Sequence, residues 1–209
     1  MRNALTTQPA VTGVPVIGAR RPEVELILPV RDREDDIRRL LADAASCLVG
    51  VAVPAAIAVV DRGSSDRTVE AVDEVAAAAR VPVRVLGCSA PGWGRAALRG
   101  ISTSLARWVL FGEPETFQAD TAPVLDHAFR LLSEGQHIVC TASEERHQTI
   151  LETAVAALLF SDQPPDGPDF VPVLRDTPAH AGLRMTAVAG PARVPGDGDR
   201  DAVLEPVAR

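Results

Sequence analysis

Short apolar runs alternate with longer amphipathic stretches from residue 24 onward. Runs rich in Val, Ile and Leu that end in turn-forming residues are typical of buried strands, and apolar residues spaced three and four apart are typical of helices. The alternation predicts βαβ units around a parallel sheet. We expect strands at residues 24–30, 56–60, 81–86, 108–111 and 137–140, and helices at 33–48, from Ser64 or Ser65 to 79, 95–105, 122–133 and 147–160.

The two ends of the chain lack this pattern. Residues 1–22 are rich in Thr, Pro and Gly and predict a disordered leader, and residues 190–209 predict a flexible tail. Residues 161–169 contain three prolines and predict a loop, followed by short strands at 170–174 and 183–188. The sequence thus predicts one α/β domain with a core at 23–160 and a smaller region at 161–189.

Composition excludes some partners. The 28 acidic against 21 basic side chains give a net charge of -7, which argues against a nucleic-acid surface. The longest apolar run, 44–60, is interrupted by Gly50 and Pro54 and is shorter than the ~20 residues of a membrane span. Three cysteines without metal-ligand spacing, and no signal-peptide pattern at the start, favour a cytoplasmic protein.

Carboxylates follow three of the first four predicted strands. Asp32 comes after the first strand, Asp61 after the second, and the segment Glu113-Pro114-Glu115 after the fourth. In open parallel sheets ligands bind outside the carboxyl ends of the strands, so these acids are predicted to surround one crevice. A diphosphate bridged by a divalent cation would suit such a crevice. The alternative is that acids are simply common at loop starts in an acidic chain.

Four ordered segments resemble family 2 glycosyltransferases of the GT-A fold. Residues 28–37 read LPVRDREDDI, where the family has PAYNE followed by acids and Ile, and residues 59–68 read VVDRGSSDRT, against VDDGSxDxT. The Gly-rich segment 92–100 is similar to the segment that precedes the third helix in the family. The strand at 108–111 is similar to the strand that delivers the family's Asp-x-Asp metal motif. The chain looks most like the polyprenyl-phosphate mannose synthase-like branch.

The resemblance implies a donor site and a metal site. Donor contacts are expected from Pro29, Asp32, Asp61, Arg62, Gly94 and Arg95. Glu113 and Glu115 replace the two aspartates of Asp-x-Asp and are expected to hold Mn²⁺ or Mg²⁺. Arg62 replaces an aspartate that in relatives accepts a hydrogen bond from the base, and an arginine can only donate.

Several residues of these segments also have a purely structural interpretation. Asp61 could close the turn at Gly63, Asp32 could cap the following helix, and Glu113 and Glu115 could be solvated loop acids. Arg95 could coat the surface of its helix, and Trp93 could serve as a buried anchor instead of stacking on a ligand.

Downstream, the acceptor region looks short compared with relatives. The resemblance makes Glu145 the candidate catalytic acid or base, because it lies where relatives have a Gly-Ser-Arg-like segment after the fifth strand. A phosphate acceptor is already an anion at neutral pH and needs no strong base, which favours a lipid phosphate such as polyprenyl phosphate at a membrane surface. The leading hypothesis is a glycosyltransferase that uses a nucleotide-sugar donor. The alternative is a catalytically reduced GT-A domain that acts as a binding or regulatory partner.

Overall fold

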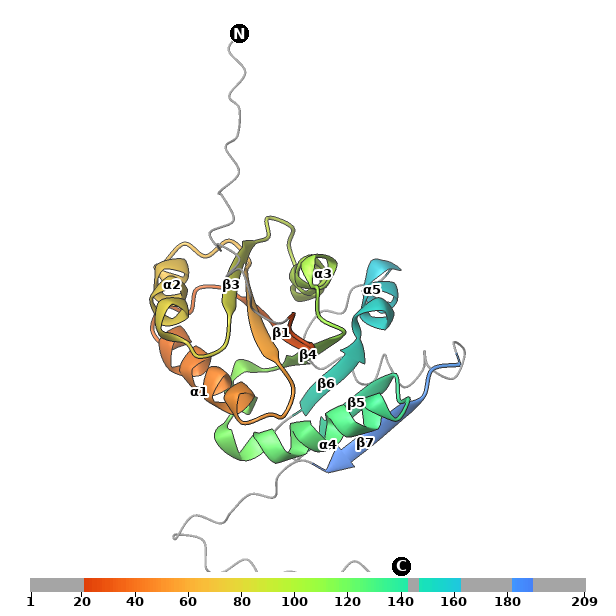
Figure 1. Ribbon diagram of the computed structural model, residues 1–209. Coiled ribbons are helices and arrows are strands. Elements are labelled where there is room, and N and C mark those ends of the chain that lie inside the picture. The colour runs from red at the N-terminus through yellow and green to blue at the C-terminus, as the bar shows by residue number, and fades with distance from the viewer. Residues whose placement is uncertain (1–20, 143–146, 163–181, 190–209) are drawn as a thin grey trace, which may run out of the picture.

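A computed structural model describes residues 21–142, 147–162 and 182–189. They form a seven-stranded sheet in the order β3-β2-β1-β4-β6-β5-β7 (Figure 1). The strands are β1 (Val24–Val30), β2 (Ala55–Asp61), β3 (Val83–Gly87), β4 (Trp108–Gly112), β5 (Ile138–Ala142), β6 (His147–Glu152) and β7 (Met185–Ala189). The helices are α1 (Ile37–Val49), α2 (Thr68–Ala78), α3 (Trp93–Thr103), α4 (Ala122–Ser133) and α5 (Thr153–Asp162).

The sheet is parallel except at β6, which pairs antiparallel with both β4 and β5. Helices α1, α2 and α4 cover one face, and α3 and α5 cover the other (Figure 1). Alternate residues of β1 therefore enter different cores: Leu26 and Leu28 pack with the first set of helices, and Ile27 with the second. The expected single α/β domain with a mostly parallel sheet is confirmed.

The predicted elements differ from the observed ones mainly at residues 147–152. The sequence predicts one helix over 147–160, but β6 occupies the first part and only α5 is helical. Thr149, Ile150 and Leu151 are all buried, because a strand lying between β4 and β5 is covered on both faces. Such a run has no alternation of polar and apolar residues, so periodicity cannot separate it from a buried helix.

The start of α2 also differs. Ser64 or Ser65 is predicted to cap it, but α2 begins at Thr68 and the residue in the cap position, Arg67, makes no side-chain cap bond. Both serines are instead engaged with the loop that follows β1. The predicted end of α4 is confirmed: Gly135 has a φ of 102° and its N–H donates to the Leu132 carbonyl.

Some predictions lie outside the described residues, namely most of the leader, the strand at 170–174 and the tail. The strand predicted at 183–188 is confirmed as β7. No helix in the described ranges is long and apolar enough to cross a membrane.

The three cysteines differ sharply in exposure. Cys47 is fully buried and Cys140 is 4% exposed, whereas Cys88 is partly accessible. Burial, reinforced by the carboxylates of Asp120 and Asp126, raises the pKa of the Cys47 thiol to about 12. Because the thiolate is the reactive form, we expect native protein to incorporate one equivalent of iodoacetamide, at Cys88, and urea-unfolded protein to incorporate three. Peptide mass mapping checks this, and modification of native Cys47 would contradict the packing of α1.

Candidate functional site

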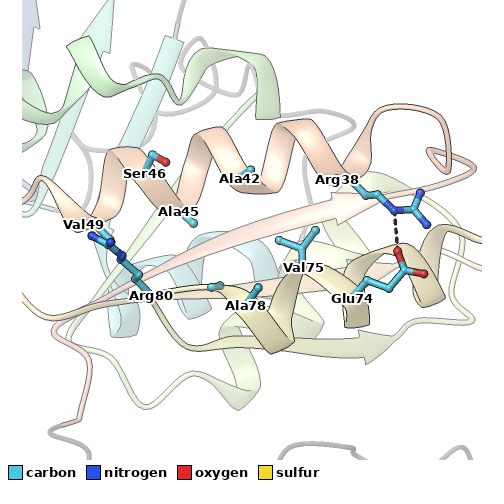
Figure 2. A pocket seen from close by; sticks show the side chains of 10 residues that line it. Arg38, Ala42, Ala45, Ser46, Val49, Glu74, Val75, Ala78 and Arg80 are labelled. Atoms are coloured by element: carbon cyan, nitrogen blue, oxygen red, sulfur yellow. Dashed lines mark hydrogen bonds and ion pairs between the residues drawn. The ribbon is translucent and has the colours of Figure 1, made fainter.

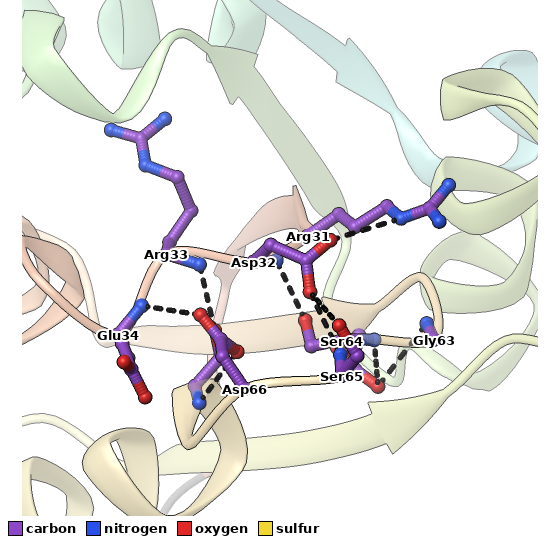
Figure 3. A network of polar contacts seen from close by, with 10 residues as sticks. Arg31, Asp32, Arg33, Glu34, Gly63, Ser64, Ser65 and Asp66 are labelled. Atoms are coloured by element: carbon purple, nitrogen blue, oxygen red, sulfur yellow. Dashed lines mark hydrogen bonds and ion pairs between the residues drawn. The ribbon is translucent and has the colours of Figure 1, made fainter.

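The loops after β1 and β2 are joined by side-chain hydrogen bonds. Val30 and Asp61 pair in register, so both loops start at the same edge of the sheet. The Asp32 N–H donates to Ser64 Oγ at 2.9 Å, and the Ser65 N–H donates to Asp32 Oδ1 at 2.7 Å (Figure 3). Asp32 sits at a φ of 48°, a left-handed conformation that aspartate tolerates better than most residues. The Ser65 N–H also holds the pKa of Asp32 below its ordinary value.

A second set of bonds continues this connection toward the helices. The Glu34 N–H donates to Asp66 Oδ2 at 3.0 Å, and in return the Arg67 N–H donates to Glu34 Oε2 at 2.8 Å. The Arg33 N–H donates to Thr68 Oγ1 at 2.7 Å, and the Thr68 hydroxyl donates in turn to Asp66 Oδ1. The hydroxyl of Thr68 lowers the pKa of Asp66. The carboxylates of Glu34 and Asp66 thus accept hydrogen bonds from backbone N–H groups at the ends of the two loops.

Asp61 closes its own turn. Its carboxylate accepts the N–H groups of Gly63 at 3.2 Å and Ser64 at 3.1 Å, and Gly63 has a φ of 79°. This is the turn-closing arrangement that the sequence left open for Asp61. Neither Asp61 nor Asp32 lines the cavity described next. Their carboxylates are used to position the loops.

A cavity of about 300 Å³ lies beside these loops, at the carboxyl ends of β1 and β4. Its charged lining consists of Arg31, Arg33, Arg62 and a single carboxylate, Glu113. The side chain of Trp93 also lines it; this ring is only 7% exposed and packs on Phe111 with centroids 5.9 Å apart. Its remaining lining residues are Leu28, Pro29, Val30, Gly112 and Pro114.

The predicted site residues therefore separate into groups. Pro29, Arg62 and Glu113 meet in the cavity, and Glu115 contacts Arg33 at its edge. Gly94 is buried within α3, and Arg95 is exposed on the same helix, so neither lines the cavity. Glu145 lies outside the described residues. Arg31, Arg33 and Trp93 also line the cavity and are not among the predicted donor contacts.

The Glu113-Pro114-Glu115 segment forms a short 3₁₀ turn, Pro114–Thr116, directly after β4. The Thr116 hydroxyl donates to the Glu113 carbonyl at 2.7 Å, and Gln148 of β6 donates to the Thr116 carbonyl at 3.0 Å. Gln148 is buried and accepts a bond from Thr141, so the turn is tied to the middle of the sheet. Loss of hydration, together with the nearby Glu115 charge, raises the pKa of Glu113.

The two glutamates do not form a free metal-binding pair. Arg33 donates to Asp36 through Nε at 2.8 Å and through its terminal nitrogen at 2.6 Å, and also to Glu115 at 2.5 Å. The hydrogen bonds that Arg33 donates to Asp36, and then the one to Glu115, hold the pKa of Arg33 above its ordinary value. Within the described ranges no three His, Cys, Asp or Glu side chains are grouped so that they could hold a metal ion. A divalent cation on both glutamates would have to displace Arg33, so the donor set does not fit a cation as arranged.

Residues 25–112 match the sequence model of the family described as "Glycosyl transferase family 2". This segment contains β1 to β4 and every residue of the cavity lining up to Gly112. Over this segment the chain is similar to family 2 glycosyltransferases. No curated protein matches the chain.

The chain is also similar to solved structures. A mannosyltransferase from Pyrobaculum calidifontis, in complex with GDP-Man and Mn²⁺, superposes with a TM-score of 0.65 at 17% identity, over 86% of this chain and 59% of its own. Glucosyl-3-phosphoglycerate synthase from Mycobacterium tuberculosis, in complex with Mn²⁺, UDP and phosphoglyceric acid, gives 0.59 at 18% identity, over 84% and 72%. These likenesses confirm the GT-A fold. The chain spans less than two thirds of the mannosyltransferase.

One signal in the sequence could have revealed the cavity arginines. Arg31 and Arg33 flank Asp32, and Arg62 follows Asp61, so each lies at the same strand ends as the acids. Residues adjacent on a loop point in different directions. When the acids turn to their own backbone, the neighbouring arginines can face the cavity.

Proposed function

We propose that this chain is a glycosyltransferase that takes a sugar from a nucleoside-diphosphate donor and passes it to an acceptor. The observation that carries the proposal is the arginine-lined cavity between the ends of β1 and β4, inside the family 2 segment. In the sheet, β2 lies on one side of β1 and β4 lies on the other, so the strand order reverses at this point. Open α/β sheets bind their ligands at this switch point.

The lining residues suit a nucleotide sugar. Guanidinium groups form paired, charge-assisted hydrogen bonds with phosphate oxygens, so Arg33 and Arg62 suit the diphosphate. The same charges would stabilise the negative charge that develops on the departing nucleoside diphosphate. Trp93 supplies an apolar wall, and Glu113 is the one carboxylate in the lining that could accept hydrogen bonds from sugar hydroxyls.

For the acceptor, we propose a molecule that carries a phosphate, with a lipid phosphate such as polyprenyl phosphate as the candidate from the sequence. The Mycobacterium tuberculosis synthase has been solved with phosphoglyceric acid and with glycerol 3-phosphate, so phosphate-bearing molecules occur in structures of this fold. Glu145 stays the candidate base. The alternative, a non-catalytic GT-A domain, is favoured by the internal use of Asp32 and Asp61 as hydrogen-bond acceptors for the chain's own loops.

Trp93 provides a direct test of donor binding. The chain has two tryptophans, and Trp108 is 1% exposed in the sheet core, away from the cavity. Titration with UDP-glucose and GDP-mannose is expected to change the intrinsic fluorescence of the intact chain through Trp93. The Trp93→Phe variant is expected to lose this signal while its calorimetric affinity stays within about threefold, because phenylalanine keeps most of the apolar contact.

Transfer itself is measured as release of nucleoside diphosphate in the presence of polyprenyl phosphate or glycerol 3-phosphate. Release that requires an acceptor supports the enzyme. Donor binding without release for any phosphate acceptor would favour the non-catalytic alternative. Failure of every nucleotide sugar to bind, by fluorescence and by calorimetry, would refute the proposed function.

A further inference from the structure

Arg33 already neutralises the acids that a cation would neutralise. Its guanidinium lies between Asp36 and Glu115 and donates to both carboxylates, at 2.6 Å and 2.5 Å from one nitrogen. The Arg33 side chain is 31% exposed and lines the cavity, so it is close to whatever the cavity binds. A positive charge is therefore built into this position by the chain itself.

Arg62 adds an unused donor at the same place. Its backbone N–H donates to the Val30 carbonyl at 2.9 Å, which fixes the residue against the end of β1. Its side-chain Nε is buried and has no hydrogen-bond partner among the described residues. A buried donor without a partner is costly, and a ligand that accepts its hydrogen bond recovers that cost.

The balance of charge in the cavity points the same way. Three arginines and one glutamate line it, in a chain whose net charge is -7. Arg31 is paired with Asp32, and Arg33 with Asp36 and Glu115, whereas Arg62 has no acidic partner among the described residues. Arg62 therefore favours an anion, and a free divalent cation would meet its charge. For a cation to reach both glutamates, the hydrogen bond from Arg33 to Glu115 would first have to break.

We propose that Arg33 and Arg62 hold the diphosphate of the donor, so that this chain binds its donor without the Mn²⁺ that is present in the solved complexes with GDP-Man and UDP. The inference rests on the proposed function. Arginine can supply this charge because its guanidinium is always protonated and presents several donors to phosphate oxygens. In this arrangement Glu115 and Asp36 act as positioning residues that orient Arg33.

Calorimetry on the full chain tests the inference, with pyrophosphate, UDP and GDP as ligands, in EDTA and in millimolar Mn²⁺. We expect binding of pyrophosphate and of at least one nucleoside diphosphate in EDTA, with an affinity that Mn²⁺ changes by less than about threefold. Arg62→Gln is expected to weaken binding at least tenfold in EDTA. Its melting temperature should be maintained, because Nε makes no bond that the substitution would break.

Two further variants sharpen the result. Arg130→Gln is the matched control, an exposed arginine of α4 outside the lining, and its affinity should equal that of the unmodified chain. Arg33→Gln removes a cavity charge and frees Glu115, so it should lose affinity in EDTA and recover part of it when Mn²⁺ is added.

The outcomes separate this inference from the proposed function. Binding in Mn²⁺ that EDTA abolishes would overturn the inference and leave the glycosyltransferase proposal standing. Equal loss in Arg62→Gln and Arg130→Gln would also overturn it, because the effect would then be one of overall charge. Failure of every diphosphate to bind in either condition would overturn both.

Discussion

A Glu25→Ala variant is expected to lose about 2–3 kcal/mol of folding free energy, because it would leave the half-buried guanidinium of Arg84 without its carboxylate partner. Glu25 lies in β1 and is 4% exposed. Its carboxylate accepts two hydrogen bonds from Arg84 of β3, at 2.7 Å and 3.0 Å. Arg84 also donates to the Thr103 hydroxyl at 2.9 Å and so connects the sheet to α3. Urea unfolding followed by circular dichroism measures the loss.

The matched control is the pair between Arg38 and Glu74, which joins α1 to α2 at 2.8 Å (Figure 2). Both of these side chains are about half exposed, so Glu74→Ala should cost no more than about 1 kcal/mol. The double variant Glu25→Leu with Arg84→Met removes both buried charges, and it is expected to recover much of the stability. Equal losses of unfolding free energy in Glu25→Ala and Glu74→Ala would show that burial does not strengthen the pair between Glu25 and Arg84.

A Gly100→Val variant is expected to destabilise the chain by about 2–3 kcal/mol through overpacking. A Cβ at Gly100 would lie 2.5 Å from Ile27 Cγ2 and 3.3 Å from Val60 Cγ2. Both neighbours are fully buried, and their γ-methyl groups are attached directly to branched Cβ atoms that cannot move aside. This glycine lets α3 approach β1 and β2 closely. Thermal and urea denaturation check the expected loss.

Gly87→Val serves as its control. Gly87 ends β3, and a Cβ there would meet nothing within 4 Å. The change should stay within about 0.5 kcal/mol. If Gly100→Val has the same melting temperature as the unmodified chain, the close approach of α3 to the sheet is not as described.

Much of the fold could be predicted from the sequence because strands buried on both faces leave long apolar runs. β1, β2 and β4 were found within one residue of their observed bounds for this reason. β6 could not be found, since a short buried strand and a buried helical turn leave the same pattern. Glu25 was also missed, because its partner Arg84 is 59 residues away and only the pairing of strands brings them together.

The sequence predicted where the candidate site lies, but not all of the residues that line it. Strand ends located the cavity, and the resemblance located Pro29, Arg62 and Glu113 within it. Hydrogen bonds within the loops decide whether an acid or the arginine next to it faces the cavity. Those bonds depend on loop geometry, which the spacing of residues in the sequence does not reveal. Asp32 turned to Ser65 and Asp61 to Gly63. The arginines beside them were left to face the cavity.

The antiparallel insertion of β6 also restricts the order in which the sheet can be assembled. β1 to β4 pair only among themselves until β6 arrives, so the half of the sheet that carries the cavity arginines is complete once residue 112 has been made. β5 pairs with β6 and β7, both of which come later in the chain. During synthesis on the ribosome, β5 therefore emerges as an apolar strand with no partner yet made, and it joins the sheet no earlier than the strand that follows it.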